Sequence, residues 1–249
     1  MILAVDIGNT NISIGGFQGK KLVSHFCIDN KSLIQKKVSL PLKSSFLNRF
    51  KNILIASVNP KMESFFYKYL DKRYKKMALK IGREIKLKIP TLVENQEKVG
   101  IDRLLNALAA FKRTKTSTIV IDFGTAITFD VVSKRGEFLG GIILPGIKTS
   151  AYALNRRTAF LPEVEIKKPT VIIGSNTEKA ICSGIYMGTV GATTHILKNI
   201  RKEFGGIRYT IATGGDSKIF KEELNQIDMF IPHLTLEGIR IAFAENFNS

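Results

Sequence analysis

Cysteine is nearly absent from this chain of 249 residues, which contains only Cys27 and Cys182. Two cysteines so far apart supply neither a disulfide framework nor a four-cysteine zinc site, so a reducing, cytoplasmic setting is expected. Long hydrophobic runs are lacking too: no stretch approaches the roughly 18 uninterrupted apolar residues of a membrane helix. Asp6 interrupts the apolar start of the chain, which excludes a signal peptide. We therefore expect a soluble protein.

Metal-binding and nucleophile signatures are also missing. The three histidines, His25, His195 and His233, have neither HxxxH nor HExxH spacing, and no cysteine lies in useful register with them. Zinc hydrolase chemistry thus lacks a ligand set. No GxSxG or Cys/His signature is present, so acyl transfer lacks a candidate nucleophile.

Acidic residues are few relative to basic ones. The sequence has 38 Lys and Arg against 21 Asp and Glu, a formal net charge of +17, which favours anionic substrates or polyanionic partners. The basic residues are scattered and form no long arm or low-complexity tail of the kind that nucleic-acid-binding proteins often carry. Nucleic acid is therefore not the expected partner. Separately, the 44% hydrophobic content is sufficient for a packed core.

One pattern occurs twice along the chain. A predicted strand at residues 2–5 precedes the polar glycine loop DIGNTN, and a second strand follows at residues 12–17. Residues 118–121 and 127–132 repeat this arrangement around the motif DFGTAIT. The two aspartates lie 122 − 6 = 116 residues apart, nearly half the chain, which indicates a duplicated unit.

Between and after these repeats, strands mix with helices, which predicts the α/β class. Further strands are predicted at residues 52–57 and 209–213, and helices at residues 60–74, from residue 100 onward, at 176–197 and at 217–224. We expect an N-terminal domain at residues 1–115 and a C-terminal domain at residues 116–249, with a cleft between them.

The two glycine loops have the chemistry of phosphate sites. Gly8 and Gly124 allow a ligand to approach the backbone closely, and the neighbouring Asn and Thr side chains donate neutral hydrogen bonds to phosphate oxygens. Asp6 follows a strand and is placed to hold Mg²⁺ through water. A hairpin turn would explain DIGNTN equally well by itself. Its recurrence in DFGTAIT favours a pair of phosphate loops that clamp a triphosphate.

Three further motifs have both a functional and a structural interpretation. In GIDR, residues 100–103, Asp102 could accept a proton and Arg103 could bind a carboxylate or phosphate, although Asp is also a common helix N-cap. In GSNT, Thr177 could contact a substrate or cap the next helix. The glycine turn TGGD, residues 213–216, could let an adenine ring pass, or it could be a plain turn.

Taken together, the motifs resemble those of type III pantothenate kinases over essentially the whole chain. In family order, the sequence contains DIGNTN, the stretch from Ser57 to Pro60, GIDRLLNALAA, DFGTAITFDVV, GGIILPGI, LPEVEI, GSNTEKAICSG, TGGD and LTLEGIR. The resemblance implies two ribonuclease-H-like domains of the actin-like ATPase fold with an ATP cleft between them. It also implies a homodimer, Mg²⁺, a monovalent cation such as K⁺ or NH₄⁺, and phosphorylation of pantothenate with ATP.

The resemblance also implies roles for individual residues. Asp102 would be the catalytic base, Arg103 would hold the pantothenate carboxylate, and Asp122 would bind the monovalent cation. The residues implied for the acceptor are Gly100, Ile101, Asp102, Arg103 and Thr177. Those implied for ATP are Asp6, Ile7, Gly8, Asn9, Thr10, Asn11, Ile12, Ser13 and Thr125.

One segment departs from the family. Val93 and Gln96 stand where the family has a substrate-facing tyrosine and a proline, which predicts a changed acceptor pocket. Two alternatives remain for the chain: an ATP-binding regulatory or nucleic-acid-associated protein with the same fold, and a kinase for another small acid.

Overall fold

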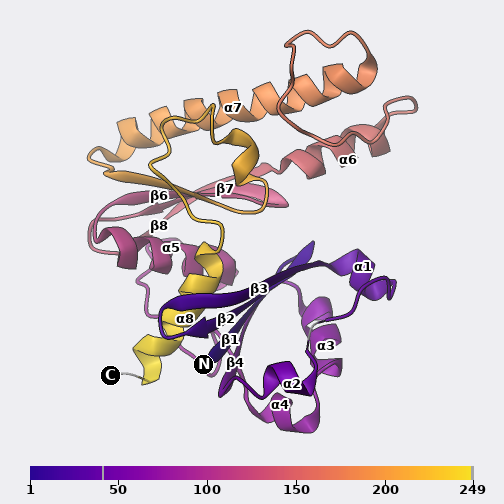
Figure 1. Cartoon of the computed structure of the whole chain (residues 1–249). Helices are drawn as coiled ribbons and strands as arrows, with labels where there is room; N and C mark the ends of the chain where they lie inside the picture. Colours follow the sequence, from indigo (N-terminus) through magenta and orange to yellow (C-terminus); the bar gives the residue numbers. More distant parts are fainter. Residues whose placement is uncertain (41, 248–249) are drawn as a thin grey trace. The chain divides into compact units, whose positions relative to one another are not determined.

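The computed structural model describes residues 1–40 and 42–247, which form two compact units (Figure 1). The first unit comprises Met1–Arg113 and the C-terminal segment from His233, and the second comprises Thr114–Pro232. This division differs from the expected domains 1–115 and 116–249, because the chain returns to the first unit for its last helix. That helix, α8 (Leu234–Phe247), buries Leu236 and Ile239 and contacts strands of the first unit.

The first unit contains a mixed five-stranded sheet. Its strands are β1 (Ile2–Ile7), β2 (Asn11–Gln18), β3 (Lys21–Asp29), β4 (Asn52–Ser57) and β5 (Ala78–Lys80). Its helices are α1 (Asn30–Ile34), α2 (Ser44–Leu47), α3 (Pro60–Lys68), α4 (Lys72–Lys76), the 3₁₀ turn η1 (Gln96–Lys98), α5 (Ile101–Thr114) and α8. The strand order is β3-β2-β1-β4-β5, with antiparallel pairing on the β2 side of β1 and parallel pairing on the β4 side.

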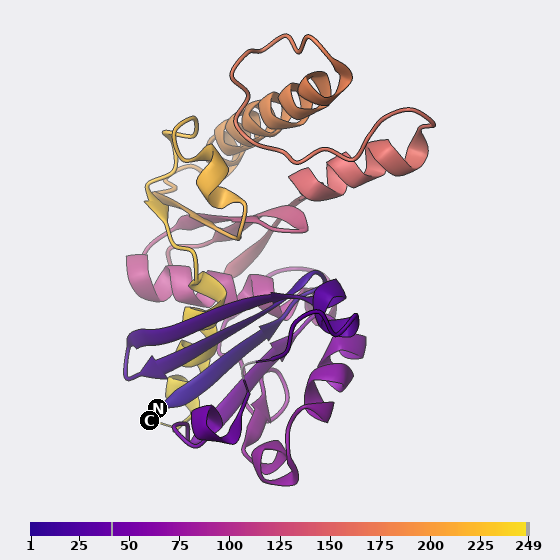
Figure 2. The same cartoon turned by 45° about the vertical axis from the view of Figure 1, so that its right-hand side comes forward.

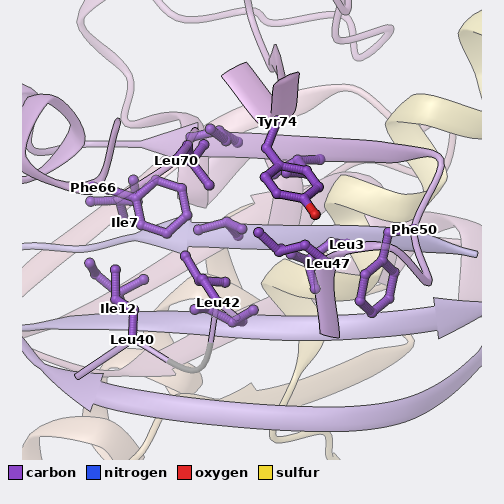
Figure 3. Packing of buried hydrophobic residues seen from close by; sticks show 14 of the residues in the cluster. Leu3, Ile7, Ile12, Leu40, Leu42, Leu47, Phe50, Phe66, Leu70 and Tyr74 are labelled. Carbon is purple, nitrogen blue, oxygen red and sulfur yellow. The ribbon is translucent and has the colours of Figure 1, made fainter. Parts of the chain in front are cut away.

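Both faces of the central strand β1 are covered. Leu3, Ile7 and other residues that alternate along β1 pack in a cluster with Phe66 of α3 and Tyr74 of α4 (Figure 3). The opposite face meets α8, where Gly15 of β2 leaves room for Leu236. The nearly continuous burial of β1 follows from this two-sided cover, which fixes the strand end that carries Asp6.

Two predicted helices are shorter in the structure. The helix expected at residues 60–74 is divided into α3 and α4, because Asp71 takes an extended conformation, with φ −61° and ψ 164°, immediately before α4. The helix expected at residues 217–224 is the 3₁₀ turn η2 (Ser217–Phe220).

The second unit repeats the topology of the first. Its strands are β6 (Thr118–Phe123), β7 (Ala126–Val132), β8 (Phe138–Pro145), β9 (Tyr209–Thr213) and β10 (Met229–Phe230). The strand order is β10-β9-β6-β7-β8, in which β6 pairs antiparallel with β7 and parallel with β9. Strand β6 thus has the position that β1 has in the first unit. This repetition is what the duplicated motifs predict.

Two helices and a long irregular loop accompany this sheet. Helix α6 (Ile147–Arg157) is followed by the loop of residues 158–176, which leads to α7 (Thr177–Phe204; Figure 2). Helix α7 ends at Gly205, whose φ of +57° suits glycine. Within residues 1–40 and 42–247, no helix combines the length and apolar character that a membrane crossing requires.

Candidate active site

The first glycine loop connects β1 to β2 and closes with a tight hydrogen bond. The register pairs Asp6 with Ser13, and the Gly8 N–H donates to Asn11 O at 2.9 Å. Asn30, at the start of α1, holds the loop from outside: its Nδ2 donates to Gly8 O at 3.0 Å and to Asn9 O at 3.1 Å. Asn30 is only 5% exposed. It is not among the site residues predicted from the sequence, because it lies about 20 positions after the loop that it contacts.

The second glycine loop has the same geometry in the second unit. Asp122 pairs with Thr128 across β6 and β7, and the Gly124 N–H donates to Ala126 O at 3.1 Å. Asp122 also lies beside Thr213 in the parallel neighbour β9, just as Asp6 lies beside Ala56 of β4. Each unit therefore presents one aspartate and one glycine turn at the equivalent place in its sheet.

The TGGD turn packs directly against the second loop. Gly214 has a φ of +89°, and a Cβ atom there would collide with Asp122 Oδ1 and Phe123 O. The Asp216 N–H then donates to Phe123 O at 3.1 Å. Glycine at position 214 is therefore required both by its conformation and by this close approach.

The start of α6 contacts the same loop. Thr125 O accepts hydrogen bonds from the Gly146 N–H at 3.0 Å and from Thr149 Oγ1 at 2.6 Å. Lys148 Nζ lies 2.7 Å from Asp216 Oδ1. The sequence motifs include Gly146 and Asp216 but give no sign that Lys148 and Asp216 would meet, since 68 residues separate them.

Asp102 lies within the first turn of α5 rather than at its cap. The helix begins at Ile101, and Asp102 Oδ1 accepts the Arg103 N–H at 2.8 Å. Burial raises the pKa of Asp102 above its usual value, although the hydrogen bond and the charge of Arg103 act in the opposite direction. A side chain at Gly100 would collide with this carboxylate. The local structure therefore presents a partly desolvated carboxylate, which suits a proton acceptor.

A cavity of about 880 Å³ borders this segment in the first unit. It is lined by the ends of β4 and β5, by the start of α5 and the segment before it, and by basic side chains such as Lys86. Ser57, Gln96, Gly100 and Ile101 also belong to the lining. Gln96, where the resemblance predicts a proline, thus belongs to the cavity wall, and its Nε2 donates to Thr91 O at 2.8 Å.

Thr177 is the first residue of α7 and borders a second cavity. The N-cap is Asn176, whose Oδ1 accepts the Lys179 N–H at 2.9 Å, so the capping interpretation of Thr177 is wrong. The cavity, about 590 Å³, lies within the second unit, between the α6–α7 loop and the start of α7.

Asp6 and Asp122 are the carboxylates that the two loops could offer to a cation. No cluster of three or more His, Cys, Asp or Glu side chains suited to a metal ion occurs among the residues that the structure describes. Mg²⁺ needs only one or two protein carboxylates when phosphates and water complete its shell, and Asp6 meets that requirement. Asp122 Oδ1 and Phe123 O both border Gly214, a carboxylate and carbonyl pair of the kind that suits a monovalent cation.

Two mixed sheets of identical topology, each with an aspartate and a glycine loop at the same position, define the actin-like ATPase fold shared by sugar kinases. A structure from Sinorhizobium meliloti assigned as a 2-dehydro-3-deoxygalactonokinase has a TM-score of 0.60 and 8% identity, covering 100% of both chains. A structure from Campylobacter jejuni assigned to the Baf family of transcriptional activators has a TM-score of 0.63 and 20% identity, covering 99% of this chain and 100% of that one. The predicted fold class is confirmed.

The sequence comparisons are more specific. The model of a family described as type III pantothenate kinase matches residues 2–199. Type III pantothenate kinases from Moorella thermoacetica and Syntrophus aciditrophicus are each 37% identical, over 99% of this chain and 100% of theirs. The enzyme of that name from Myxococcus xanthus is 34% identical over 100% of both chains. This chain belongs to the type III pantothenate kinase family.

Proposed function

We propose that this chain transfers the γ-phosphate of ATP to the hydroxyl group of pantothenate, the first step of coenzyme A synthesis. Family membership supports the proposal. The observation in the chain itself that carries it is Asp102, a carboxylate of raised pKa in the first turn of α5, directly after two residues that line a cavity.

Asp102 would act as the general base. Its carboxylate takes the proton from the pantothenate hydroxyl while the hydroxyl oxygen bonds to the γ-phosphorus and ADP leaves. Arg103, next to it, would bind the pantothenate carboxylate through its planar guanidinium. Gly100, Ile101 and Thr177 would complete the acceptor contacts.

The two glycine loops would bind ATP. In the first unit the proposed contacts come from residues 6–13, and in the second unit from Thr125. Asn30 supports this assignment indirectly, because it fixes the carbonyl groups of Gly8 and Asn9 and so leaves the loop preformed. Phosphoryl transfer depends mainly on such positioning and on charge neutralisation.

Two cations complete the proposal. Asp6 would hold Mg²⁺ through water, and Asp122 would hold a monovalent cation, K⁺ or NH₄⁺. Mg²⁺ there would neutralise charge on the phosphates during transfer. The donor sets described above support both assignments.

We also propose that the protein is a homodimer and works in the cytoplasm. The second unit exposes large apolar side chains of a kind that a partner would cover, including Phe160, which is 94% exposed, and Ile173, which is 88% exposed. The cytoplasmic location is supported by the thiol state of both cysteines.

The test is a coupled assay of ADP release with the full chain. ADP formation should require pantothenate, Mg²⁺ and K⁺ together, and the product should carry one phosphate on the pantothenate hydroxyl. A panel of other small hydroxy acids distinguishes pantothenate from another acceptor: a second acid that is turned over faster would overturn the assignment of the substrate.

The net charge of +17 motivates a second candidate, an ATP-binding regulatory or nucleic-acid-associated protein with this fold. A gel-shift titration separates the two. DNA binding that weakens steeply with salt, without pantothenate-dependent ADP release, would favour the second candidate.

A further inference from the structure

The start of α6 and the turn after β9 are joined by an ion pair for which the proposed function has no use. Lys148 Nζ lies 2.7 Å from Asp216 Oδ1, and the lysine side chain is 75% exposed whereas that of the aspartate is 12% exposed. An ion pair with one partner in solvent contributes little to folding stability. Stabilisation of the fold is therefore a weak reason for a lysine at this position.

Both partners are attached to the same loop. Gly146 and Thr149, on either side of Lys148 in the sequence, donate hydrogen bonds to Thr125 O. Asp216 donates its N–H to Phe123 O. The ion pair therefore joins two segments that each hydrogen bond to the loop of residues 123–125.

The loop lacks a positive charge of its own. Its donors to a phosphate would be the hydroxyl group of Thr125 and backbone N–H groups, which are neutral. A nucleoside triphosphate carries several negative charges, and enzymes that transfer phosphoryl groups neutralise part of them with lysine or arginine. Lysine supplies a compact charge on a flexible stem, so the ammonium can move from a carboxylate to a nearby phosphate oxygen.

We propose that Lys148 contacts the β- and γ-phosphates of the bound nucleotide, and that Asp216 holds the ammonium beside the loop until the nucleotide binds. The inference rests on the proposed function, in that it takes the loop after β6 to be nucleotide-binding. It adds to the site a residue that the sequence motifs leave out.

The test is calorimetric titration of the full chain with ATP, ADP and AMP in the presence of Mg²⁺. Replacing a phosphate-contacting lysine by alanine should weaken ATP and ADP binding about tenfold, while AMP binding changes less than twofold. Lys148→Arg should retain most of the affinity, because the charge is kept. Lys148→Gln provides a second neutral variant if the alanine variant is unstable.

A matched control removes the same charge elsewhere in the same unit. Lys134 is exposed in the turn between β7 and β8, at the opposite end of the sheet from the loop of residues 123–125. Lys134→Ala should leave the affinity for ATP within about twofold of the parent protein, because distant exposed charges are largely screened.

Asp216→Asn separates a direct phosphate contact from a structural role. If Lys148 contacts phosphate, Asp216→Asn should retain or improve ATP affinity while Lys148→Ala loses it. The inference is overturned if both variants and the double variant lose affinity equally, because Lys148 would then act only through its partner. It is also overturned if Lys148→Ala binds ATP like the parent protein, or loses AMP affinity as strongly.

The same experiment separates this inference from the proposed function. A parent protein that binds ATP but releases no ADP with pantothenate would overturn the function, and the variants would still decide the role of Lys148. A parent protein that binds no nucleotide would overturn both.

Discussion

At the scale of single residues, burial of the proposed base Asp102 lowers the stability of the fold at neutral pH. Burial disfavours its ionised form and raises the pKa of its carboxyl group above the value in the unfolded chain. The folded state therefore binds this proton more tightly than the unfolded state. The stability that the group contributes is present at low pH and is lost as the pH rises through the folded pKa.

Asp102→Asn should remove the proposed base, and so lower turnover strongly, without destabilising the fold. The loss of a general base typically lowers the rate by about 10²- to 10⁴-fold. The urea midpoint at pH 8 should equal or exceed that of the parent protein, and the difference should shrink as the pH is lowered, because protonation of the carboxyl group removes the cost of burying its charge. Turnover by the asparagine variant at the parent rate would contradict the role of base.

The pKa of His25 is shifted in the opposite direction, below its ordinary value. Its ring centroid lies 4.1 Å from that of His233, and its Nε2 is 3.0 Å from Ser13 Oγ. Burial, and secondly the neighbouring His233, lower the pKa of His25 below its ordinary value of about 6.5. The stability that His25 contributes is therefore fully present above its pKa in the unfolded chain, and it is lost as the pH falls through its pKa in the folded protein.

We expect the free energy of unfolding to fall between pH 7.5 and pH 5, and to fall less in His25→Gln, which can still hydrogen bond to Ser13. His195→Gln is the control, because His195 is exposed on α7. Urea titrations at several pH values measure the effect. Identical pH profiles for the parent and His25→Gln would exclude this histidine as the source.

At the scale of elements, the packing of the C-terminal helix α8 against α5 requires a close approach of their backbones at Gly238. A Cβ atom at Gly238 would collide with the backbone carbonyl of Leu105 in α5, both in the first unit. Gly238→Ala should therefore lower the free energy of unfolding by about 1–3 kcal/mol, as overpacking of a core does. Gly191→Ala in α7 is the matched control: no atom lies within 4 Å of the added Cβ. Helix propensity should make that variant about 0.5–1 kcal/mol more stable.

The position of α8 in the first unit could not be predicted from the sequence, whereas other features could. The glycine loops and the start of α5 are local features, since their residues follow one another and their chemistry is visible in short motifs. The return of α8 to the first unit depends on tertiary packing against strands more than 200 positions earlier, such as β1. The contacts of Asn30 with the first loop and of Lys148 with Asp216 also arise only when distant strand ends meet.

At the scale of the whole molecule, duplication explains much of the architecture. Two sheets with the same strand order position Asp6 and Asp122 at the same register, so the same arrangement of strand, glycine loop and strand is used twice. The sequence comparison of the two halves predicts this repetition, because both copies keep the aspartate, the glycine and the threonine. It does not predict the unequal additions, above all the long α6–α7 loop of the second unit.

That loop provides the test of the homodimer. Ile173 is 88% exposed, and a glutamate placed in an apolar interface would bring an uncompensated charge into it. Ile173→Glu should convert the dimer to monomer at micromolar concentrations in sedimentation experiments, while circular dichroism remains unchanged.

Ile34→Glu is the control for that change, because Ile34 is 54% exposed on α1 in the first unit and lies outside the proposed surface. It should leave the sedimenting mass of the parent protein unaltered. A monomeric parent protein would refute the homodimer, and a fully dimeric Ile173→Glu protein would exclude the α6–α7 loop as its interface. If the dimer is needed for acceptor binding, Ile173→Glu should also raise the KM for pantothenate more than that for ATP, since Thr177 directly follows this loop.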